Sequence, residues 1–335
     1  LVGRSSELFN NRITDLQCIA LLEVLEAIST VETINISYNR IGDTAASAIS
    51  RFLEAHDAIK TFDISFNRLS TEGMTTITNG LRNNTTLQVF NVSGNPIGNE
   101  GGMQLAEMLQ MNNSMKAIHL NDCELGAESL IAFSTVLLTN VSLEEIHLSN
   151  PRLASLQGET LIHFATMLLS NTTLINLDLS KNKIRDNQLE HLTEALKRNK
   201  TLKILNLRGN EIAVQGGMMI GRMLKINKAL TNINLSANQI GDYGCHEIAQ
   251  ALQTNKQVVN LNICYNGVGA LGLTSLAAAL QNNTTIRSLF VWGNKFTPES
   301  ADAMAVAFKT NEMLEETDIV VCYVDGVAGV AQHNG

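Results

Sequence analysis

The sequence has little of what membrane insertion or secretion requires. No stretch approaches the roughly 18 consecutive apolar residues of a membrane-spanning helix, and no secretory signal peptide is visible at its start. Aromatic residues make up only 4% of the 335 residues, and there is one tryptophan. We therefore expect no membrane insertion, and the position of each aromatic residue becomes informative.

An excess of positive charge is also missing. Lysine and arginine number 24 against 32 acidic residues, which gives a formal net charge of −8. A surface that binds nucleic acid needs a basic stripe to neutralise phosphates. We therefore expect no nucleic-acid partner.

Paired cysteine spacings are absent as well. The pattern fits neither a C-x-x-C zinc site nor a disulfide-bonded cap, which favours a reducing, cytoplasmic compartment. The five cysteines are Cys18, Cys123, Cys245, Cys264 and Cys322. We place Cys123 and Cys322 at the asparagine position of the repeat described below.

Motifs for catalysis are missing too. The sequence has no evident nucleophile–base pair, phosphate-binding loop or metal-ligand spacing. We therefore predict that the protein is not an enzyme and has no catalytic residues, cofactor or metal.

What the sequence does contain is a repeat of 28 residues. The pattern L-x-x-L-x-L-x-x-N begins at Leu202 and again at Leu230, and Val258 begins the next copy. Isoleucine or valine replaces leucine at some positions. Periods of this length indicate stacked structural units, which usually display a binding surface rather than enclose a reaction.

Each repeat predicts a strand followed by a helix. The first apolar residues alternate, as in a strand, and later ones such as Ile248 and Leu252 fall four apart, as on one helix face. A helical crossover makes the strands parallel. Strands lie about 4.8 Å apart and packed helices about 8–10 Å, so stacking bends the array. The predicted fold is an α/β solenoid, a horseshoe with a concave parallel sheet and convex helices.

The repeat length, the Ile-Gly turn at Ile97 and Ile240 and the full helix resemble the leucine-rich repeats of ribonuclease-inhibitor-like proteins. The resemblance covers roughly residues 3–322 and implies a protein-binding scaffold. On this basis we divide the chain into an N-terminal partial repeat at 1–30, ten leucine-rich repeats at 31–313, and a C-terminal partial repeat with a hairpin cap at 314–335.

Two asparagines recur in each repeat. The first follows the strand, as at Asn95 and Asn238, where its side-chain amide can bond backbone groups of neighbouring turns. The second ends the helix, as at Asn112 and Asn140. We expect this second asparagine there because asparagine tolerates the left-handed conformation that helix ends favour.

The C-terminus departs from the repeat. Asp325-Gly326 lies between short apolar runs and predicts a hairpin turn, and this hairpin could cover the exposed edge strand. The turn and the segment from Leu289 to Asn294 resemble the family of leucine-rich repeat-containing protein thirty-four, which occurs in germ cells and ciliated cells. That resemblance implies a cytoplasmic, ciliary or nuclear scaffold.

One repeat in the middle of the chain is irregular. The repeat that begins at Leu143 has 31 residues, has Pro151 at its asparagine position, and has a turn stretched through residues 154–158. Insertions in repeat proteins map to loops, so this is either drift in a loop or a rim loop that contacts a partner.

Residues 28 apart lie on neighbouring strands, so the concave face can be arranged in rows. Most of it is amide and hydroxyl, and we expect it to be solvated. Aromatic residues gather at the ends, and exposed aromatics are favoured anchors of interfaces, although they could instead pack on the cap and on one another. We assign partner binding to Tyr38, Phe66, Tyr265, Phe290 and Trp292, with Arg208 in the same rows.

A second candidate group lies near the middle of the repeats and comprises His119, Asp122, Glu145, His147 and Asp178. Two histidines on adjacent strands could reach one metal ion or form a pH-sensitive patch. An open sheet offers no enclosed pocket, so we assign these residues to partner binding and not to a metal.

Three functions are compatible with these patterns. We favour a non-enzymatic scaffold that binds protein partners through the concave sheet and rim loops, with an assembly role in the axoneme of cilia or flagella implied by the C-terminal resemblance. The repeats also resemble those of the GTPase-activating proteins for Ran, although no acidic tail follows them here. The third alternative is the ligand-recognition arm of an immune sensor.

Overall fold

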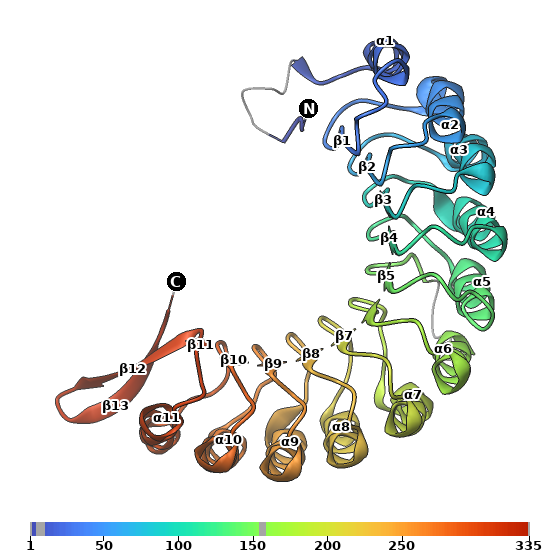
Figure 1. Ribbon diagram of the computed structural model, residues 1–335. Coiled ribbons are helices and arrows are strands. Elements are labelled where there is room, and N and C mark those ends of the chain that lie inside the picture. Colours follow the sequence, from blue (N-terminus) through green and yellow to red (C-terminus); the bar gives the residue numbers. More distant parts are fainter. Residues whose placement is uncertain (1, 5–10, 154–158, 334–335) are drawn as a thin grey trace. The chain divides into compact units, whose positions relative to one another are not determined.

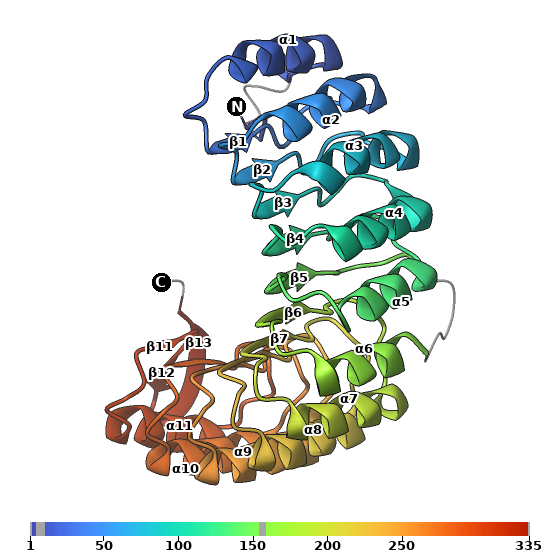
Figure 2. The same cartoon turned by 45° about the vertical axis from the view of Figure 1, so that its right-hand side comes forward.

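Each repeat folds as a short strand, a turn and a helix. The structure is a computed structural model that describes residues 2–4, 11–153 and 159–333. It comprises two compact units, Leu1–His163 and Phe164–Gly335. Within each unit the strands line one layer and the helices the other, and the helices fan out on the convex side (Figures 1 and 2).

The first unit contains, in chain order, α1 Asp15–Glu26, β1 Thr33–Asn35, a 3₁₀ turn Asp43–Ala45, α2 Ala46–Ala55, β2 Thr61–Asp63, α3 Thr71–Asn83, β3 Val89–Asn91, α4 Gly98–Met111, β4 Ala117–His119, α5 Ala127–Val136, β5 Glu145–His147 and the first part of α6 Glu159–Ser170. The second unit contains β6 Asn176–Asp178, α7 Asp186–Arg198, β7 Ile204–Asn206, α8 Val214–Ile226, β8 Asn232–Asn234, α9 Gly241–Thr254, β9 Asn260–Asn262, α10 Ala270–Asn282, β10 Ser288–Phe290, α11 Pro298–Thr310, β11 Glu316–Thr317, β12 Ile319–Val324 and β13 Val327–Gln332.

The repeat strands, β1–β5 in the first unit and β6–β11 in the second, are parallel and pair in register at the repeat length. Ile34 lies opposite Phe62, and Leu205 opposite Ile233. These middle residues are buried against the helices, whereas the first and third residues of each strand lie on the other face. The predicted α/β architecture, with a parallel sheet and a layer of helices, is confirmed.

The asparagine after each strand performs the predicted structural role. The side chain of Asn95 is fully buried, and its Nδ2 donates to the carbonyl oxygens of Ile64 and Val92 at 3.0 and 2.8 Å. Its Oδ1 accepts from the backbone N–H of Leu69 at 3.1 Å. Cys123 replaces this asparagine in one repeat, and its thiol donates to the carbonyl oxygen of Val92 at 3.3 Å. One side chain therefore joins two consecutive repeats.

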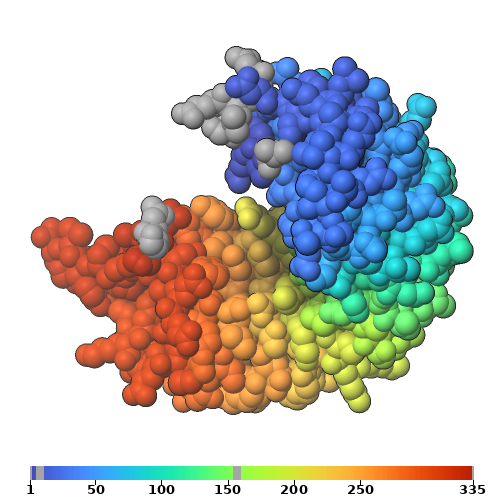
Figure 3. Space-filling model, turned by 45° about the horizontal axis from the view of Figure 1, so that its top comes forward, coloured from blue at the N-terminus to red at the C-terminus, as the bar shows by residue number. Residues whose placement is uncertain are grey.

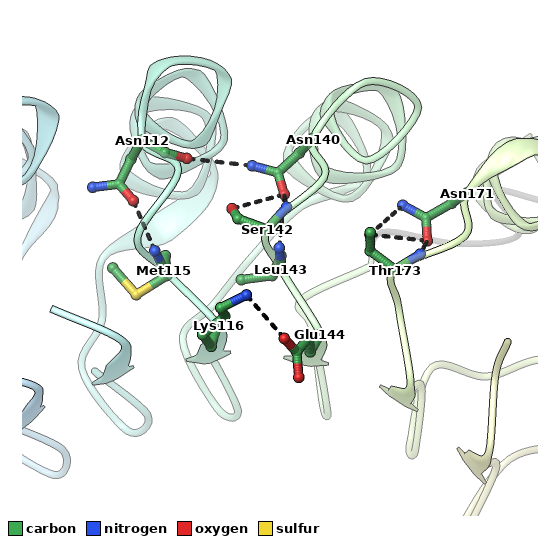
Figure 4. A network of polar contacts seen from close by, with 9 residues as sticks. All are labelled: Asn112, Met115, Lys116, Asn140, Ser142, Leu143, Glu144, Asn171 and Thr173. Atoms are coloured by element: carbon green, nitrogen blue, oxygen red, sulfur yellow. Dashed lines mark hydrogen bonds and ion pairs between the residues drawn. The ribbon is translucent and has the colours of Figure 1, made fainter. Parts of the chain in front are cut away.

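The asparagine that ends each helix is present for a different reason from the one predicted. Asn112 has φ −80° and ψ 125°, an extended conformation rather than a left-handed one. Its Nδ2 donates to the carbonyl oxygens of Leu81 and Asn84, both at 2.9 Å, and its Oδ1 accepts from the N–H of Met115 at 2.9 Å. Asn140 makes the equivalent bond in the next repeat, where it donates to the carbonyl oxygen of Asn112 (Figure 4). We call this series of helix-end asparagines the asparagine ladder. Asparagine is required here for its donor and acceptor, not for its backbone conformation.

The C-terminal hairpin forms with the expected turn. β12 and β13 pair as a separate antiparallel sheet, with φ of 52° at Asp325 and 81° at Gly326. The hairpin packs against α11 and projects from the end of the second unit (Figures 1 and 3). Cys322 lies exposed within β12, so its placement at a repeat asparagine was wrong.

The sheet edge at this end is capped by Asp318, a residue whose role the repeat pattern does not reveal. Its carboxylate accepts from the backbone N–H groups of Val291 and Trp292 at 2.8 and 3.1 Å. In the preceding repeat the N–H of Ile263 donates to the carbonyl oxygen of Phe290 in the following repeat, and the N–H of Cys264 donates to Oδ1 of Asn262 in its own repeat. One carboxylate thus replaces both a backbone carbonyl of a following repeat and the side-chain oxygen that normally closes the strand, and it satisfies donors that would otherwise attract another strand.

The irregular turn at residues 154–158 lies outside the described residues. The proposed boundaries at residues 30 and 313 remain predictions. No helix of the described chain is both long and apolar enough to cross a membrane.

Two adjacent asparagines allow a matched test of how much the asparagine ladder stabilises the fold. Asn112 is buried and bonds backbone groups of two repeats, whereas the neighbouring Asn113 is exposed and donates only to Met111 in its own repeat. Because Asn112→Ala leaves buried backbone groups unsatisfied, we expect it to lower the free energy of unfolding by about 3 kcal/mol. Urea denaturation should show a loss of less than about 0.5 kcal/mol for Asn113→Ala. Equal losses would contradict the role of the ladder.

Candidate partner-binding face

The third residues of the strands form a row across each unit, which we call the strand-end row. It contains Asn35, Asp63, Asn91, His119 and His147 in the first unit and Asp178, Asn206, Asn234, Asn262 and Phe290 in the second.

Asparagine and aspartate in this row close the end of each strand. Asp63 Oδ1 accepts from the backbone N–H of Ser65 at 2.9 Å, two residues along the chain. Such a side-chain bond stabilises a turn. The same bond occurs at Asn35, Asn91, Asp178, Asn206, Asn234 and Asn262. These residues of the row therefore have a structural reason to be present.

Three residues of the row do not have this role. After His119, the N–H two residues later donates to Ser93 Oγ at 3.3 Å, and after His147 it donates to Asn121 Oδ1 at 2.9 Å. After Phe290, that N–H donates to Asp318. Another side chain therefore accepts the backbone N–H bond in each of these turns. His119, His147 and Phe290 do not close their own strands.

The row two residues further along is less exposed than predicted. Ser65 and Ser236 are at most 5% exposed, and Cys264 is 8% exposed. The reason is the turn itself, which folds the serine beneath the preceding side chain; Ser236 Oγ donates to Asn234 Oδ1 at 2.7 Å. Arg208 remains exposed and Trp292 half-buried, so these two keep surface that a partner can reach.

His119, Glu145 and His147 meet on the sheet face of the first unit. Glu145 and His147 are two residues apart on β5, so their side chains lie on the same face, and His119 pairs with His147 across β4 and β5. Glu145 Oε1 lies 3.0 Å from Nε2 of His119 and 2.8 Å from Nε2 of His147. The imidazole rings stack with centroids 4.3 Å apart. We call these three residues the His–Glu–His cluster.

Electrostatics within the cluster favour an uncharged His119. Burial lowers the pKa of His119, and the neighbouring His147 lowers it further. The carboxylates of Glu145 and, more weakly, Asp63 oppose this shift.

The other two acids predicted for this group are placed differently. Asp122 lies in the turn after β4, where its carboxylate accepts from Asn150 Nδ2 at 2.6 Å. Asp178 belongs to the second unit, where it is buried, closes the turn at Ser180 and accepts from Asn206 Nδ2 at 2.9 Å. Of the five residues grouped from the sequence, the structure brings His119, Glu145 and His147 together.

The N-terminal aromatic residues pack on each other. Tyr38 and Phe66 are stacked with centroids 4.4 Å apart, and both have positive φ. A Cβ atom on Gly94 would lie 2.4 Å from the ring of Phe66. The aromatic ring therefore requires a glycine one repeat later.

Tyr265 repeats this arrangement in the second unit. Its ring lies over Gly293, where a Cβ atom would come within 2.2 Å, yet 57% of the tyrosine stays exposed. An aromatic residue held in place by its own repeat, with an open face, is well suited to anchor a partner.

A hollow of about 270 Å³ lies beside Phe290 on the sheet face of the second unit, and we call it the Phe290 hollow. It is lined by Ile204, Leu205, Asn206, Asn232, Ile233, Asn234, Asn260, Leu261, Asn262 and Phe290. In Asn234 and Asn262 the Oδ1 closes the turn, and in the described structure their Nδ2 groups donate to no protein acceptor. The hollow thus combines one aromatic ring with two available N–H donors.

The pKa of His119 can be tested by NMR titration of the imidazole protons. Because burial and His147 lower this pKa, we expect His119 to titrate at a lower pH than an ordinary histidine side chain does. Glu145→Gln removes a charge that raises the pKa, so it should lower the pKa of His119 further. A rise in that variant would refute the assigned geometry.

The packing of Tyr265 on Gly293 can be tested against a second glycine. Gly293 and Gly267 have φ of 76° and 67°, but no atom lies near a Cβ at Gly267. Gly267→Ala should cost about 1–2 kcal/mol through backbone conformation alone. Gly293→Ala should cost at least about 1 kcal/mol more because the new methyl group collides with the ring. In a Tyr265→Ala background, thermal or urea unfolding should show that this difference has disappeared; if it persists, the ring is not its cause.

Comparisons with known proteins agree with this architecture. A family model described as "Leucine Rich repeat" matches residues 27–50, 83–106, 112–134, 170–187 and 198–221. No curated protein matches the chain. A solved structure titled "Leiomodin-1 Actin-Binding Site 2 (ABS2)" is similar at 20% identity and a TM-score of 0.36, covering 55% of this chain and 87% of that one. A likeness this distant carries no argument about function. The matched segments and the parallel strand–helix repeats together show that this chain contains leucine-rich repeats and folds as an α/β leucine-rich repeat solenoid.

Proposed function

We propose that this chain is a protein-binding scaffold that holds a segment of its partner against the sheet face of the second unit. The observation that carries this proposal is the Phe290 hollow. There the repeat substitutes an aromatic residue for a turn-closing amide, and a hollow of about 270 Å³ opens beside it.

The chemistry of the hollow suits a peptide segment. Phe290 and the half-exposed Ile204 offer apolar surface, and the Nδ2 groups of Asn234 and Asn262 offer N–H donors. A partner with an apolar side chain flanked by backbone carbonyl oxygens would satisfy both. The donors are spaced by neighbouring strands, about 4.8 Å apart, so a segment that crosses the strands would meet them in succession.

Residues around the hollow extend the proposed surface. Tyr265 is exposed, Trp292 is half-buried, and Arg208 adds one positive charge. In the first unit, Tyr38 and Phe66 form a smaller aromatic patch, over which the Arg4 guanidinium lies 5.7 Å from the Tyr38 centroid. These residues, together with Asp122, Asp178 and the His–Glu–His cluster, remain proposed partner contacts.

The narrower role, assembly of a ciliary or flagellar axoneme, rests on the C-terminal resemblance alone. We retain it as the cellular setting in which a partner should first be sought. The ribonuclease-inhibitor-like subfamily and the cytoplasmic location likewise remain predictions.

Site-specific photocrosslinking tests the proposed surface and identifies the partner. A benzophenone amino acid in place of Phe290 should crosslink one protein in extracts of the native tissue. The same group in place of Tyr243, an aromatic residue on α9 that is 66% exposed, serves as the control. The proposal fails if both positions give the same crosslinks.

Binding of the purified partner then measures the contribution of each anchor. We expect Phe290→Ala and Tyr265→Ala each to weaken binding by about 2 kcal/mol, a roughly thirtyfold rise in Kd, as buried aromatic anchors do. Tyr243→Ala should leave the Kd unchanged. If the anchor variants bind normally, or lose binding only because their unfolding temperature falls, the hollow is not the site.

A further inference from the structure

The His–Glu–His cluster is the strongest feature of the described chain apart from the Phe290 hollow. We propose that His119, Glu145 and His147 bind one divalent transition-metal ion, and that Zn²⁺ is the ion they fit best. This inference does not depend on the partner site at the Phe290 hollow, because the cluster lies in the first unit and the hollow in the second.

The repeat itself brings the three donors together. His119 and His147 hold the same position in consecutive repeats, and the strands place them directly opposite each other. Glu145 shares a face with His147 because side chains two residues apart on a strand point the same way. Opposite Glu145 stands Ala117, whose small side chain leaves the carboxylate room to reach His119.

The geometry is close to that of a zinc site. The three donor groups offer ligand atoms that all lie within 4.8 Å of one another. Zinc bonds nitrogen and oxygen at about 2.0–2.2 Å with tetrahedral angles, which places ligand atoms about 3.4 Å apart. Glu145 Oε1 is 3.0 and 2.8 Å from the two Nε2 atoms. Small rotations of the side chains therefore open the space for one ion.

The donor chemistry favours zinc over magnesium or calcium. Two imidazoles and one carboxylate suit zinc, copper or nickel, whereas magnesium and calcium prefer sets made only of oxygen ligands. Three protein ligands leave the fourth position of a tetrahedral ion open. The side chains of His119, Glu145 and His147 are 25, 33 and 22% exposed, so an ion can enter from solvent and water or another group can complete the site.

The cluster also departs from the turn-closing role of its row. His119 and His147 stand where asparagine or aspartate would close the strand, and neighbouring side chains have taken over that bond. Two histidines with only a packing role would not require the Glu145 carboxylate within hydrogen-bond distance of both Nε2 atoms. A metal ion accounts for all three residues at once.

Isothermal titration with Zn²⁺ tests the site in the full chain. The parent protein should carry no histidine tag and should contain Cys322→Ser, since Cys322 is the exposed thiol among the described cysteines. After removal of metal with a chelator, we expect one equivalent of Zn²⁺ to bind. Co²⁺ should give the visible absorption of a four-coordinate ion with nitrogen and oxygen ligands.

Substitutions in the cluster test whether the ion binds there, and a substitution of a distant histidine serves as the control. His119→Asn and His147→Asn place the usual residue of the row in the cluster, so both should fold. Each of them, and Glu145→Gln, should weaken Zn²⁺ binding by about tenfold or more, at least the loss seen when a supporting group of a metal site is removed. His191→Ala, which changes an exposed histidine on α7, should bind as the parent does.

Two results would overturn the proposal. One is that the folded parent binds no Zn²⁺. The other is that it binds Zn²⁺ with an affinity that none of the three cluster variants changes, which would place the ion elsewhere.

Discussion

The structure depends on side-chain amides that satisfy backbone groups of neighbouring repeats. A repeat this short leaves turns between layers, and the N–H and C=O groups in those turns are buried without partners of their own. Asn95 and Asn112 show both solutions, one after the strand and one after the helix. Each uses its two N–H bonds and its oxygen to join a repeat to the preceding or following one. The apolar core drives the stacking, and these amides fix how each layer meets the next.

The same constraint separates structural residues from residues that are available for function. A strand-end asparagine or aspartate closes its own turn, so its presence needs no other explanation. His119, His147 and Phe290 are different, because Ser93, Asn121 and Asp318 supply the bond that they do not. The two candidate binding features, the His–Glu–His cluster and the Phe290 hollow, lie around these three residues.

Periodicity made the fold predictable, since alternation and four-residue spacing identify the strand and the helix of each repeat. It also brought His119 and His147 together, because equal positions in consecutive repeats must be neighbours. Several features do not repeat and were missed or misjudged. Asp318 acts only at the last edge, and Cys322 departs from the repeat into a hairpin. The burial of the serine row depends on a side-chain turn that apolar patterning does not reveal, and the extended backbone at Asn112 depends on its hydrogen bonds.

Asparagine and aspartate close most strands of the strand-end row, whereas at His119, His147 and Phe290 another side chain makes the turn bond, and reciprocal substitutions test this distinction directly. Asn91 and His119 are paired on β3 and β4, so they share one environment. The free energies of unfolding of metal-free His119→Asn and Asn91→His should be measured under the same conditions. We predict that His119→Asn is at least as stable as the parent, whereas Asn91→His loses about 1 kcal/mol because the turn bond to Ser93 is lost. The account is contradicted if Asn91→His costs nothing and His119→Asn destabilises the chain.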